Sequence, residues 1–164
     1  MPSSPIIRPF AESDALAVAD IIDYFSLNTF ASYASGKVGK AGVEQLFSLA
    51  DEDPFWVVEV DATIVGSGGL KAIHGGDCVR RTGEVGYSFQ PEYTGRVYGS
   101  LLLEHLEAEA RTRGMDTLVA SISSKNERSI AFHVTHGFVE CGRFVRAGRK
   151  FDQDFDIVWM QKFI

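Results

Sequence analysis

The sequence predicts an α/β (α+β) domain with a mixed, mostly antiparallel central sheet of about seven strands, flanked by about four helices. Two observations lead to this fold class. Segments with strand periodicity and segments with helical periodicity follow one another in the order βααβββαβαββ. Neighbouring strands that short turns would join as antiparallel hairpins also occur toward both ends, and this excludes a doubly wound parallel sheet.

Length and composition favour one domain over residues 1–164. A chain of 164 residues can bury its own core, and its 45% hydrophobic and 23% charged residues are typical of globular proteins. The net charge of −6 gives no support to nucleic-acid binding. No segment has the pattern of a signal peptide or of a membrane span, so we expect a cytoplasmic protein without a membrane partner.

The first part of the chain predicts one strand, two helices and a long connection. Residues 6–8 are a short strand, and Ser13 is expected to cap a helix over residues 13–25. Residues 26–39 are polar, contain glycine and include several aromatic residues. Connections of this length that are ordered often carry function. A second helix is expected over residues 40–50.

The middle of the chain predicts three strands and a long helix. Residues 55–60 and 63–72 form a hairpin around a tight turn at Asp61 and Ala62. A strand over residues 81–90 is closed by Pro91. The long helix begins at residue 96 or 97 and runs to 113, where Gly114 ends it because glycine readily adopts the left-handed conformation.

The last part predicts a strand over residues 117–123 and a helix over residues 126–136 with Asn126 as its cap. Two antiparallel strands follow, over residues 138–145 and 155–160, with the turn around Ala147 and Gly148. The two cysteines, Cys78 and Cys141, form neither a disulfide framework nor a zinc-binding spacing. We expect both to be small, buried apolar residues.

The strand around Glu84 is the first place where we expect chemistry. Alternation puts Glu84 on the same face as Gly86 and Ser88, two very small residues that would leave a hollow beside the carboxylate. A carboxylate in such a position can serve as a general base. The alternative is a solvated Glu at the edge of a strand, which is the usual environment of this residue type.

The turn over residues 90–100 leads from that strand into the long helix. A glycine-containing turn before a helix can bind an anion, because unpaired N–H groups and the helix dipole both favour negative charge there. Gly95 and Gly99 flank Arg96 in this turn. A plain turn explains the same residues equally well, and the pattern is neither a dinucleotide fingerprint nor a Walker loop.

The helix over residues 126–136 carries one polar stripe. Asn126, Ser129 and His133 stand at i, i+3 and i+7 and therefore share one face. Taken alone, this stripe is more readily explained by a capped helix with a solvated face.

Together these segments resemble the GNAT (GCN5-related N-acetyltransferase) superfamily, and within it the phosphinothricin and methionine-sulfone acetyltransferase branch. The resemblance spans nearly the whole chain, from residue 7 to residue 160. It rests on an Ile-Arg-Pro opening at residues 7–9, a Thr-x-Glu-Val-x-x-x-x-x-Pro run from Thr82 to Pro91, and an acyl-CoA turn and helix over residues 93–103. The most specific match is an Asn-x-x-Ser-x-x-x-His-x-x-x-Gly-Phe segment ending at Phe138.

The resemblance implies a metal-independent N-acetyltransferase that moves an acetyl group from acetyl-CoA to a small amino-acid-like amine in a ternary complex. Glu84 would take a proton from the substrate ammonium, since free amines are largely protonated near pH 7. His133 would stand near the sulfur as the candidate acid. Backbone N–H groups of residues 87–89, where the strand of the family bulges, would meet the tetrahedral oxyanion.

The resemblance also assigns binding residues. The amine pocket would include Asn28, Phe30, Arg80 and Thr82, with Arg80 pairing with a substrate carboxylate. A solvated Arg80, and packing roles for Asn28 and Phe30, remain as alternatives. The acyl-CoA contacts are expected from the end of the strand, the turn, the start of the long helix and the polar stripe: Tyr87, Ser88, Phe89, Thr94, Gly95, Arg96, Val97, Tyr98, Gly99, Ser100, Asn126 and Ser129.

The phosphate-binding signature of the family, Gln/Arg-x-x-Gly-x-Gly/Ala, is only partly present. Its first position is Thr94 and its first glycine is Val97, so only Gly99 matches. The Cβ of Val97 would crowd the pyrophosphate, and we expect weaker acetyl-CoA binding or a shifted loop. A protein or peptide N-terminal acetyltransferase and a non-catalytic acyl-CoA-binding module are the alternative functions. The branch is commonly dimeric, which implies a possible homodimer.

Overall fold

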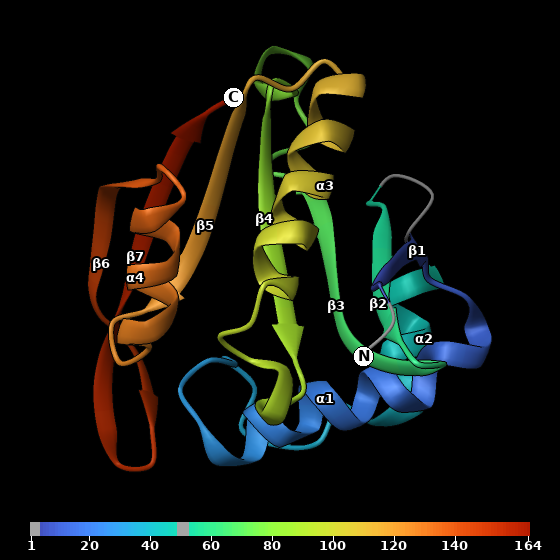
Figure 1. Cartoon of the computed structure of the whole chain (residues 1–164). Coiled ribbons are helices and arrows are strands. Elements are labelled where there is room, and N and C mark those ends of the chain that lie inside the picture. The colour runs from blue at the N-terminus through green and yellow to red at the C-terminus, as the bar shows by residue number, and fades with distance from the viewer. Residues whose placement is uncertain (1–3, 49–52) are drawn as a thin grey trace.

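The computed structural model describes residues 4–48 and 53–164 and confirms the predicted fold class. Within these residues a seven-stranded sheet has the order β1-β2-β3-β4-β5-β7-β6 (Figure 1). Neighbouring strands pair antiparallel except β4 and β5, which are parallel. The strands are β1 (Ile6–Pro9), β2 (Phe55–Val60), β3 (Thr63–Ala72), β4 (Thr82–Phe89), β5 (Thr117–Ser123), β6 (Val139–Lys150) and β7 (Gln153–Phe163).

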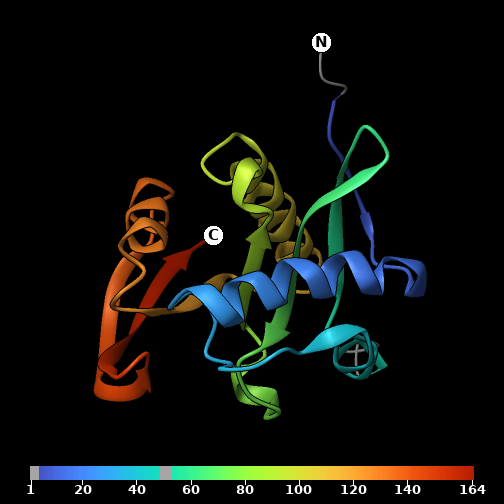
Figure 2. The same ribbon diagram turned by 90° about the horizontal axis from the view of Figure 1, so that it is seen from below.

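Helices cover both faces of the sheet. In Figure 2, α1 (Ala15–Asn28) and α2 (Gly39–Ser48) lie on one face, and α3 (Tyr98–Thr112) and α4 (Glu127–Thr135) lie on the other. One buried apolar cluster joins α1 and α2 to the sheet around Val18, Val43 and Val57. A larger cluster joins α3 to the opposite face around Leu102 and Leu106, which are both fully buried. Burying each such leucine contributes about 1.5–3 kcal/mol to folding.

Several local predictions match the structure. Asp61 and Ala62 have φ of 48° and 60°, as a two-residue hairpin turn between twisted strands requires. Gly114 and Gly137, with φ of 75° and 87°, follow α3 and α4 at their C-terminal ends. The Oδ1 atom of Asn126 accepts a hydrogen bond from the Ser129 N–H at 3.3 Å and so caps α4. The last two positions of the predicted second helix, 49 and 50, lie outside the described residues.

The start of α1 differs from the prediction, because Ser13 does not cap it. Residues 12–14 form a 3-10 turn, and α1 begins at Ala15 and continues to Asn28. Asp14 holds this turn: its Oδ2 atom accepts a hydrogen bond from the Ala11 N–H at 2.8 Å and lies 2.7 Å from Nη1 of Arg8 in β1. The hydrogen bond from the Arg8 guanidinium lowers the pKa of Asp14. A contact with the first strand therefore sets this helix start.

The C-terminal hairpin is also longer than predicted, and its turn lies elsewhere. β6 continues to Lys150, and the turn is formed by Phe151 and Asp152, with φ of 49° and 58°. The predicted turn at 147–148 is instead an irregularity within β6, where the pairing register shifts between Phe144 and Gly148 and Arg146 has φ of 52°. Bulges and turns favour the same small or left-handed residues, which explains the misplacement.

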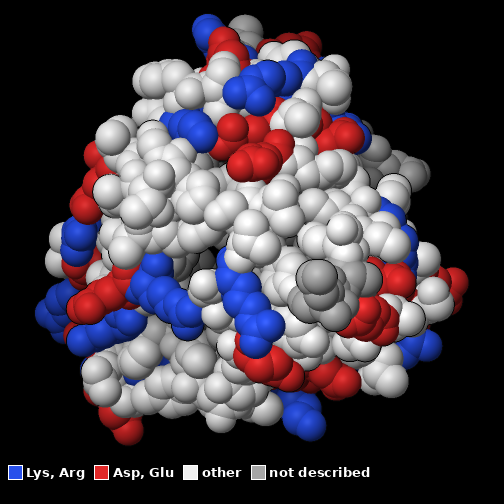
Figure 3. Space-filling model, in the orientation of Figure 1, with Lys and Arg blue, Asp and Glu red and all other residues white. Residues whose placement is uncertain are grey.

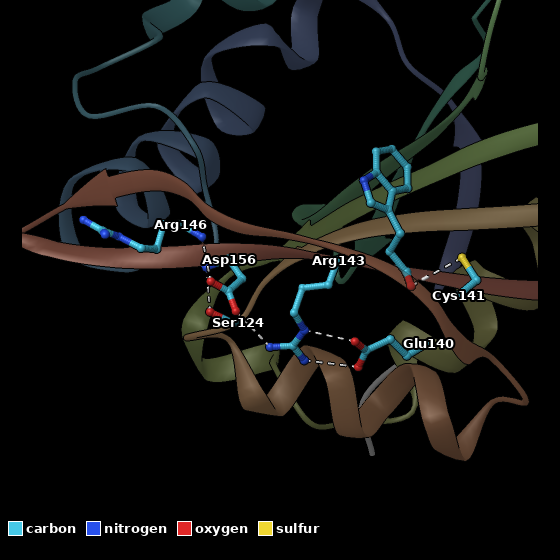
Figure 4. Close-up of polar contacts among 7 residues, drawn as sticks. Ser124, Glu140, Cys141, Arg143, Arg146 and Asp156 are labelled. Carbon is cyan, nitrogen blue, oxygen red and sulfur yellow. Dashed lines mark hydrogen bonds and ion pairs between the residues drawn. The ribbon is translucent and has the colours of Figure 1, made fainter.

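Asp156 of β7 holds this irregularity in place (Figure 4). Its Oδ1 atom accepts a hydrogen bond from the Arg146 N–H at 2.8 Å, and its Oδ2 atom accepts one from Arg143 at 3.1 Å. Arg143 also donates to Glu140 at 3.0 Å. The Arg146 N–H and then the Arg143 guanidinium lower the pKa of Asp156. The network thus bridges β7 to the irregular part of β6, and both strands continue beyond it to Lys150 and Gln153.

The prediction that the cysteines are buried is wrong. Cys78 and Cys141 are both free and exposed. Cys141 belongs to β6, which ends the sheet and pairs only with β7, so most of its residues face solvent. Its Sγ atom lies 3.5 Å from the Trp159 carbonyl oxygen (Figure 4). Cys78 lies in a 3-10 turn over residues 77–79 that precedes β4.

Among residues 4–48 and 53–164, no helix has both the length and the apolar character that crossing a membrane requires.

Candidate active site

The parallel strands β4 and β5 separate after Glu84. They are paired only at residues 82–84 of β4 and 117–119 of β5. On the outer sides the pairing continues, since β3 stays with β4 as far as Phe89 and β7 stays with β5 as far as Ser123. The sheet is therefore split along the second half of β4. Glu84 stands at the point where the split begins.

A cavity of about 300 Å³ lies beside the open half of β4. Its walls come from the end of β4, the turn before α3, the first turns of α3 and α4, and the end of α1 with the segment after it. Nine of the twelve residues predicted to contact acyl-CoA line this one cavity: Tyr87, Ser88, Phe89, Thr94, Gly95, Arg96, Gly99, Asn126 and Ser129. Segments that are far apart in the sequence thus form one site.

The other three predicted acyl-CoA residues do not line this cavity. Val97 is 60% exposed, and Tyr98 is buried in the core under α3. The Ser100 hydroxyl lies 2.9 Å from Nε2 of His136, the residue that directly follows α4. Their neighbours Gly95 and Gly99 do line the cavity.

The cavity has the features of an anion site at the start of α3. Val97 occupies the N-cap position of this helix and provides no side-chain cap. The hydroxyl of Thr94 is engaged within the turn, where it donates to the Gln90 carbonyl oxygen at 3.1 Å. Uncapped N–H groups and the positive end of the helix dipole therefore remain available for a negatively charged ligand.

Backbone N–H groups also face the split in the sheet. The Gln90 N–H donates to Val65 of β3 at 2.8 Å, whereas the Arg81 carbonyl oxygen accepts from Thr117 of β5 at 3.2 Å. Backbone groups alternate in direction along a strand. The N–H and C=O groups of the even-numbered residues of β4 therefore point toward β3, and those of the odd-numbered residues point toward β5. β5 has left the register beyond Glu84, so the Tyr87 and Phe89 N–H groups point into the split.

The expected bulge at residues 87–89 is absent. The register between β3 and β4 runs without a shift from Ala72↔Gly83 to Gly66↔Phe89. The Tyr87 and Phe89 N–H groups lack a strand partner because β5 diverges from β4, and not because β4 bulges.

Glu84 is half-buried, and its Oε1 atom accepts a hydrogen bond from the Ser121 hydroxyl of β5 at 2.8 Å. It lines a second cavity of about 330 Å³ together with Asp53, Lys71 and Gly86. A Cβ placed on Gly86 would meet nothing within 4 Å, so the predicted hollow beside the carboxylate exists. Glu84 precedes Tyr87 by three residues, which is about 10 Å along a strand.

His133 lies behind the wall of the first cavity. It is only 3% exposed, and its Nε2 atom lies 2.8 Å from the Tyr87 hydroxyl. Its Nδ1 atom lies 2.7 Å from the Ser129 carbonyl oxygen, so Nδ1 carries the proton and Nε2 accepts from Tyr87. Burial lowers the pKa of His133 and raises the pKa of Tyr87, which keeps both groups neutral. Tyr87, not His133, reaches the cavity.

The predicted amine-binding residues are not brought together. Asn28 is exposed at the end of α1, where its Nδ2 atom donates to the Tyr24 carbonyl oxygen at 2.8 Å. Phe30 packs edge-on against Phe151 of the C-terminal hairpin, with ring centroids 5.3 Å apart. Thr82 is the half-buried first residue of β4, two positions before Glu84.

Arg80 lies outside the cavity of Glu84. It pairs with Asp77 at 3.1 Å, its side chain is 72% exposed, and it lines a third cavity of about 310 Å³ with His74 and Arg113. The second and third cavities share Pro54 in their walls.

Sequence reasoning missed three residues of these sites. Ser121 was not predicted as a site residue, although the alternation of side chains along β5 is a signal that could have indicated its position beside Glu84. Lys71 is the direct cross-strand neighbour of Glu84. Arg128 stands in the first turn of α4 and lines the first cavity, and its position next to the polar stripe was the only available signal.

The split between two parallel strands, with a carboxylate where it begins and a cavity that reaches the start of α3, is the arrangement of an enzyme site. The model of the acetyltransferase (GNAT) family matches residues 19–138 of this chain. The chain therefore belongs to the GNAT family of acetyltransferases.

Individual relatives agree with this assignment. The L-amino acid N-acyltransferase MnaT of Escherichia coli K12 is 30% identical over 158 residues, covering 94% of this chain and 91% of the relative. The structure of the ribosomal-protein-alanine N-acetyltransferase of Brucella melitensis has a TM-score of 0.90 at 30% identity, covering 97% of this chain and 99% of that one. The Salmonella typhimurium protein yncA, solved with its cofactor acetyl-CoA, has a TM-score of 0.89 at 26% identity, covering 98% of this chain and 94% of that one.

Proposed function

We propose that this enzyme transfers an acetyl group from acetyl-CoA to the amine of a small amino-acid-like substrate by direct transfer in a ternary complex. The observation that carries the proposal is the position of Glu84, at the apex of the split between β4 and β5, with an anion-binding cavity along the same split. The acetyl-CoA bound to the Salmonella typhimurium relative and the amino-acid acylation named for the Escherichia coli relative support it.

In this proposal Glu84 accepts a proton from the substrate ammonium. The Ser121 hydroxyl, 2.8 Å from Oε1, orients the carboxylate and leaves its second oxygen for the amine or for an intervening water. The neutral amine then attacks the thioester carbonyl carbon. The negative charge that develops on the carbonyl oxygen is met by the Tyr87 and Phe89 N–H groups that point into the split.

The carbon–sulfur bond then breaks, the attacking nitrogen loses its second proton to solvent, and the departing thiolate takes a proton. His133 is our candidate acid, but a proton from it reaches the cavity only through Tyr87. The protonated imidazole would donate to the Tyr87 oxygen while the Tyr87 hydroxyl donates to sulfur. Burial lowers the pKa of His133, so this donor is a minor species near pH 7. A thiol pKa of about 8.5 makes the thiolate a good leaving group even with a hydrogen bond alone.

A second candidate function is acetylation of a protein or peptide N-terminus, which the likeness to the Brucella melitensis enzyme favours. Such a substrate needs an open groove at residues 26–39. Here Phe30 and Tyr33 pack on Phe155, each with ring centroids 5.9 Å apart, and Lys150 Nζ donates to the Ser32 carbonyl oxygen at 2.9 Å. The segment is thus joined to the C-terminal hairpin, which favours a small amine.

We also propose that the enzyme is a homodimer. β6 ends the sheet and exposes large apolar residues, with Val139, Phe144 and Val145 between 60% and 71% exposed. Such a row on an edge strand is typical of a surface that another chain covers. Light scattering coupled to gel filtration measures the mass directly.

The decisive experiment follows thiol release from acetyl-CoA with three classes of acceptor. Amino-acid sulfones, sulfoximines and phosphinic acids are compared with polyamines and with peptides that begin with alanine. We expect saturable release with the first class. Glu84→Gln should lower kcat by about 10²- to 10⁴-fold, because it removes the general base but keeps the shape of the side chain.

Glu104→Gln is the matched control, since it removes the same charge from an exposed residue of α3. We expect it to behave as the unaltered enzyme. Full activity of Glu84→Gln would contradict the assigned base. Preference for the peptides would favour the second candidate function. Binding of acetyl-CoA without thiol release for any acceptor would leave a non-catalytic acyl-CoA-binding module.

A further inference from the structure

Two arginines without an acidic partner flank the first cavity. Most arginines of this acidic chain are paired, for example Arg8 with Asp14 and Arg81 with Asp116. Within residues 4–48 and 53–164, the side chains of Arg96, Arg113 and Arg128 have no ion pair or hydrogen bond with a neighbour. Of these, Arg96 and Arg128 line the same cavity.

The two charges come from different elements. Arg96 belongs to the turn before α3, with its guanidinium carbon 5.2 Å from the centre of the Tyr93 ring. Arg128 belongs to the first turn of α4 and reaches across to Gly95. In Figure 3, basic side chains stand on both sides of a hollow between the lower end of α4 and the segment before α3. Unpaired arginines that converge on a hollow favour an anionic ligand.

Gly95 makes room for the Arg128 side chain. It has φ of 77°, and a Cβ placed on it would lie 2.1 Å from Nη2 and 3.3 Å from the guanidinium carbon of Arg128. Any side chain at position 95 would therefore displace the guanidinium from the cavity wall. Glycine is therefore needed at position 95 for two reasons: the backbone is left-handed there, and the guanidinium of Arg128 from α4 lies where a Cβ would be.

We infer that Arg128, with Arg96, supplies the cationic contact to the phosphates of coenzyme A that this chain lacks at Thr94. The family signature resembled here has Gln or Arg at that position, while the Thr94 hydroxyl is bonded within its own turn. Val97, which replaces the first glycine of the signature, is 60% exposed and outside the cavity wall. The inference rests on the proposed use of acetyl-CoA, and it assigns the phosphate contact to α4.

Calorimetric titration with coenzyme A, 3′-dephospho-coenzyme A and pantetheine tests the inference. Arg128→Gln should weaken coenzyme A binding about tenfold or more, as loss of a charge-assisted hydrogen bond predicts, and should leave pantetheine binding unchanged. Arg113→Gln is the matched control, because it removes an unpaired arginine at the opposite end of α3. It should change neither affinity.

The two truncated ligands locate the contact. If Arg128 pairs with the 3′-phosphate, its substitution has no effect on dephospho-coenzyme A; if it pairs with the pyrophosphate, the loss persists with that ligand. Both results support the inference. Unaltered coenzyme A affinity in Arg128→Gln, or a loss equal to that of Arg113→Gln, overturns it. If the unaltered enzyme binds no coenzyme A at all, the proposed function fails first, and the two failures are thereby distinguished.

Discussion

Asn126 offers a way to separate the stability of α4 from the binding of acetyl-CoA. Its Oδ1 atom caps the helix by accepting from the Ser129 N–H at 3.3 Å, and the same residue lines the first cavity. Its amide nitrogen is a donor suited to a carbonyl oxygen of the pantetheine arm. Asn126→Asp keeps the capping oxygen but replaces the nitrogen, whereas Asn126→Ala removes both.

The magnitudes follow from these two contacts. Loss of an N-cap costs about 1 kcal/mol, and the long 3.3 Å bond favours the lower part of the usual range. In a chain of 164 residues this corresponds to a fall in Tm of about 2–4 °C for Asn126→Ala. Asn126→Asp should keep the Tm, since a carboxylate suits a helix N-terminus. The KM for acetyl-CoA should rise about three- to tenfold in both variants, as loss of one neutral hydrogen bond predicts.

The assays are thermal unfolding followed by circular dichroism and initial rates at varied acetyl-CoA with saturating amine. An unchanged KM in Asn126→Asp would show that the amide nitrogen does not contact the cofactor. An unchanged Tm in Asn126→Ala would show that the cap contributes nothing measurable. A KM that rises only in the variant with the lower Tm would mean that binding responds to helix order alone.

Two further predictions concern the histidine and the second cavity. Burial of His133, with His136 nearby, holds its pKa below the ordinary value of about 6.5, so the unfolded chain binds a proton that the folded chain excludes. The free energy of unfolding, measured in urea, should therefore fall as the pH drops below about 6.5. His133→Gln should make the free energy of unfolding less dependent on pH in this range. An unaltered pH dependence in His133→Gln would contradict the lowered pKa of His133. Gly86→Leu should fill the cavity beside Glu84, because nothing lies within 4 Å of the new Cβ. We expect a KM for the amine that is at least about tenfold higher, as an occluded pocket predicts, with the KM for acetyl-CoA unchanged; an unaffected amine KM would place the amine elsewhere.

The sequence was sufficient where neighbours along the chain decide the outcome. The stops at Gly114 and Gly137, the cap at Asn126 and the hairpin turn at Asp61 depend on backbone preferences of single residues. Alternation along β4 likewise placed Glu84 beside a hollow, because the side-chain period of a strand is fixed. Short motifs at fixed spacings were also enough to indicate the family.

Tertiary contacts decided the remaining features. The Arg8–Asp14 ion pair accompanies a start of α1 that is later than predicted, and the Asp156 contact accompanies a bulge where a turn was predicted. Each contact joins residues of two different elements, and the sequence does not show which elements lie next to each other. The same holds for the site. Which side chain reaches a cavity depends on how strands diverge and helices pack, and so only the fold could place Tyr87 in front of His133 or Arg128 against Gly95.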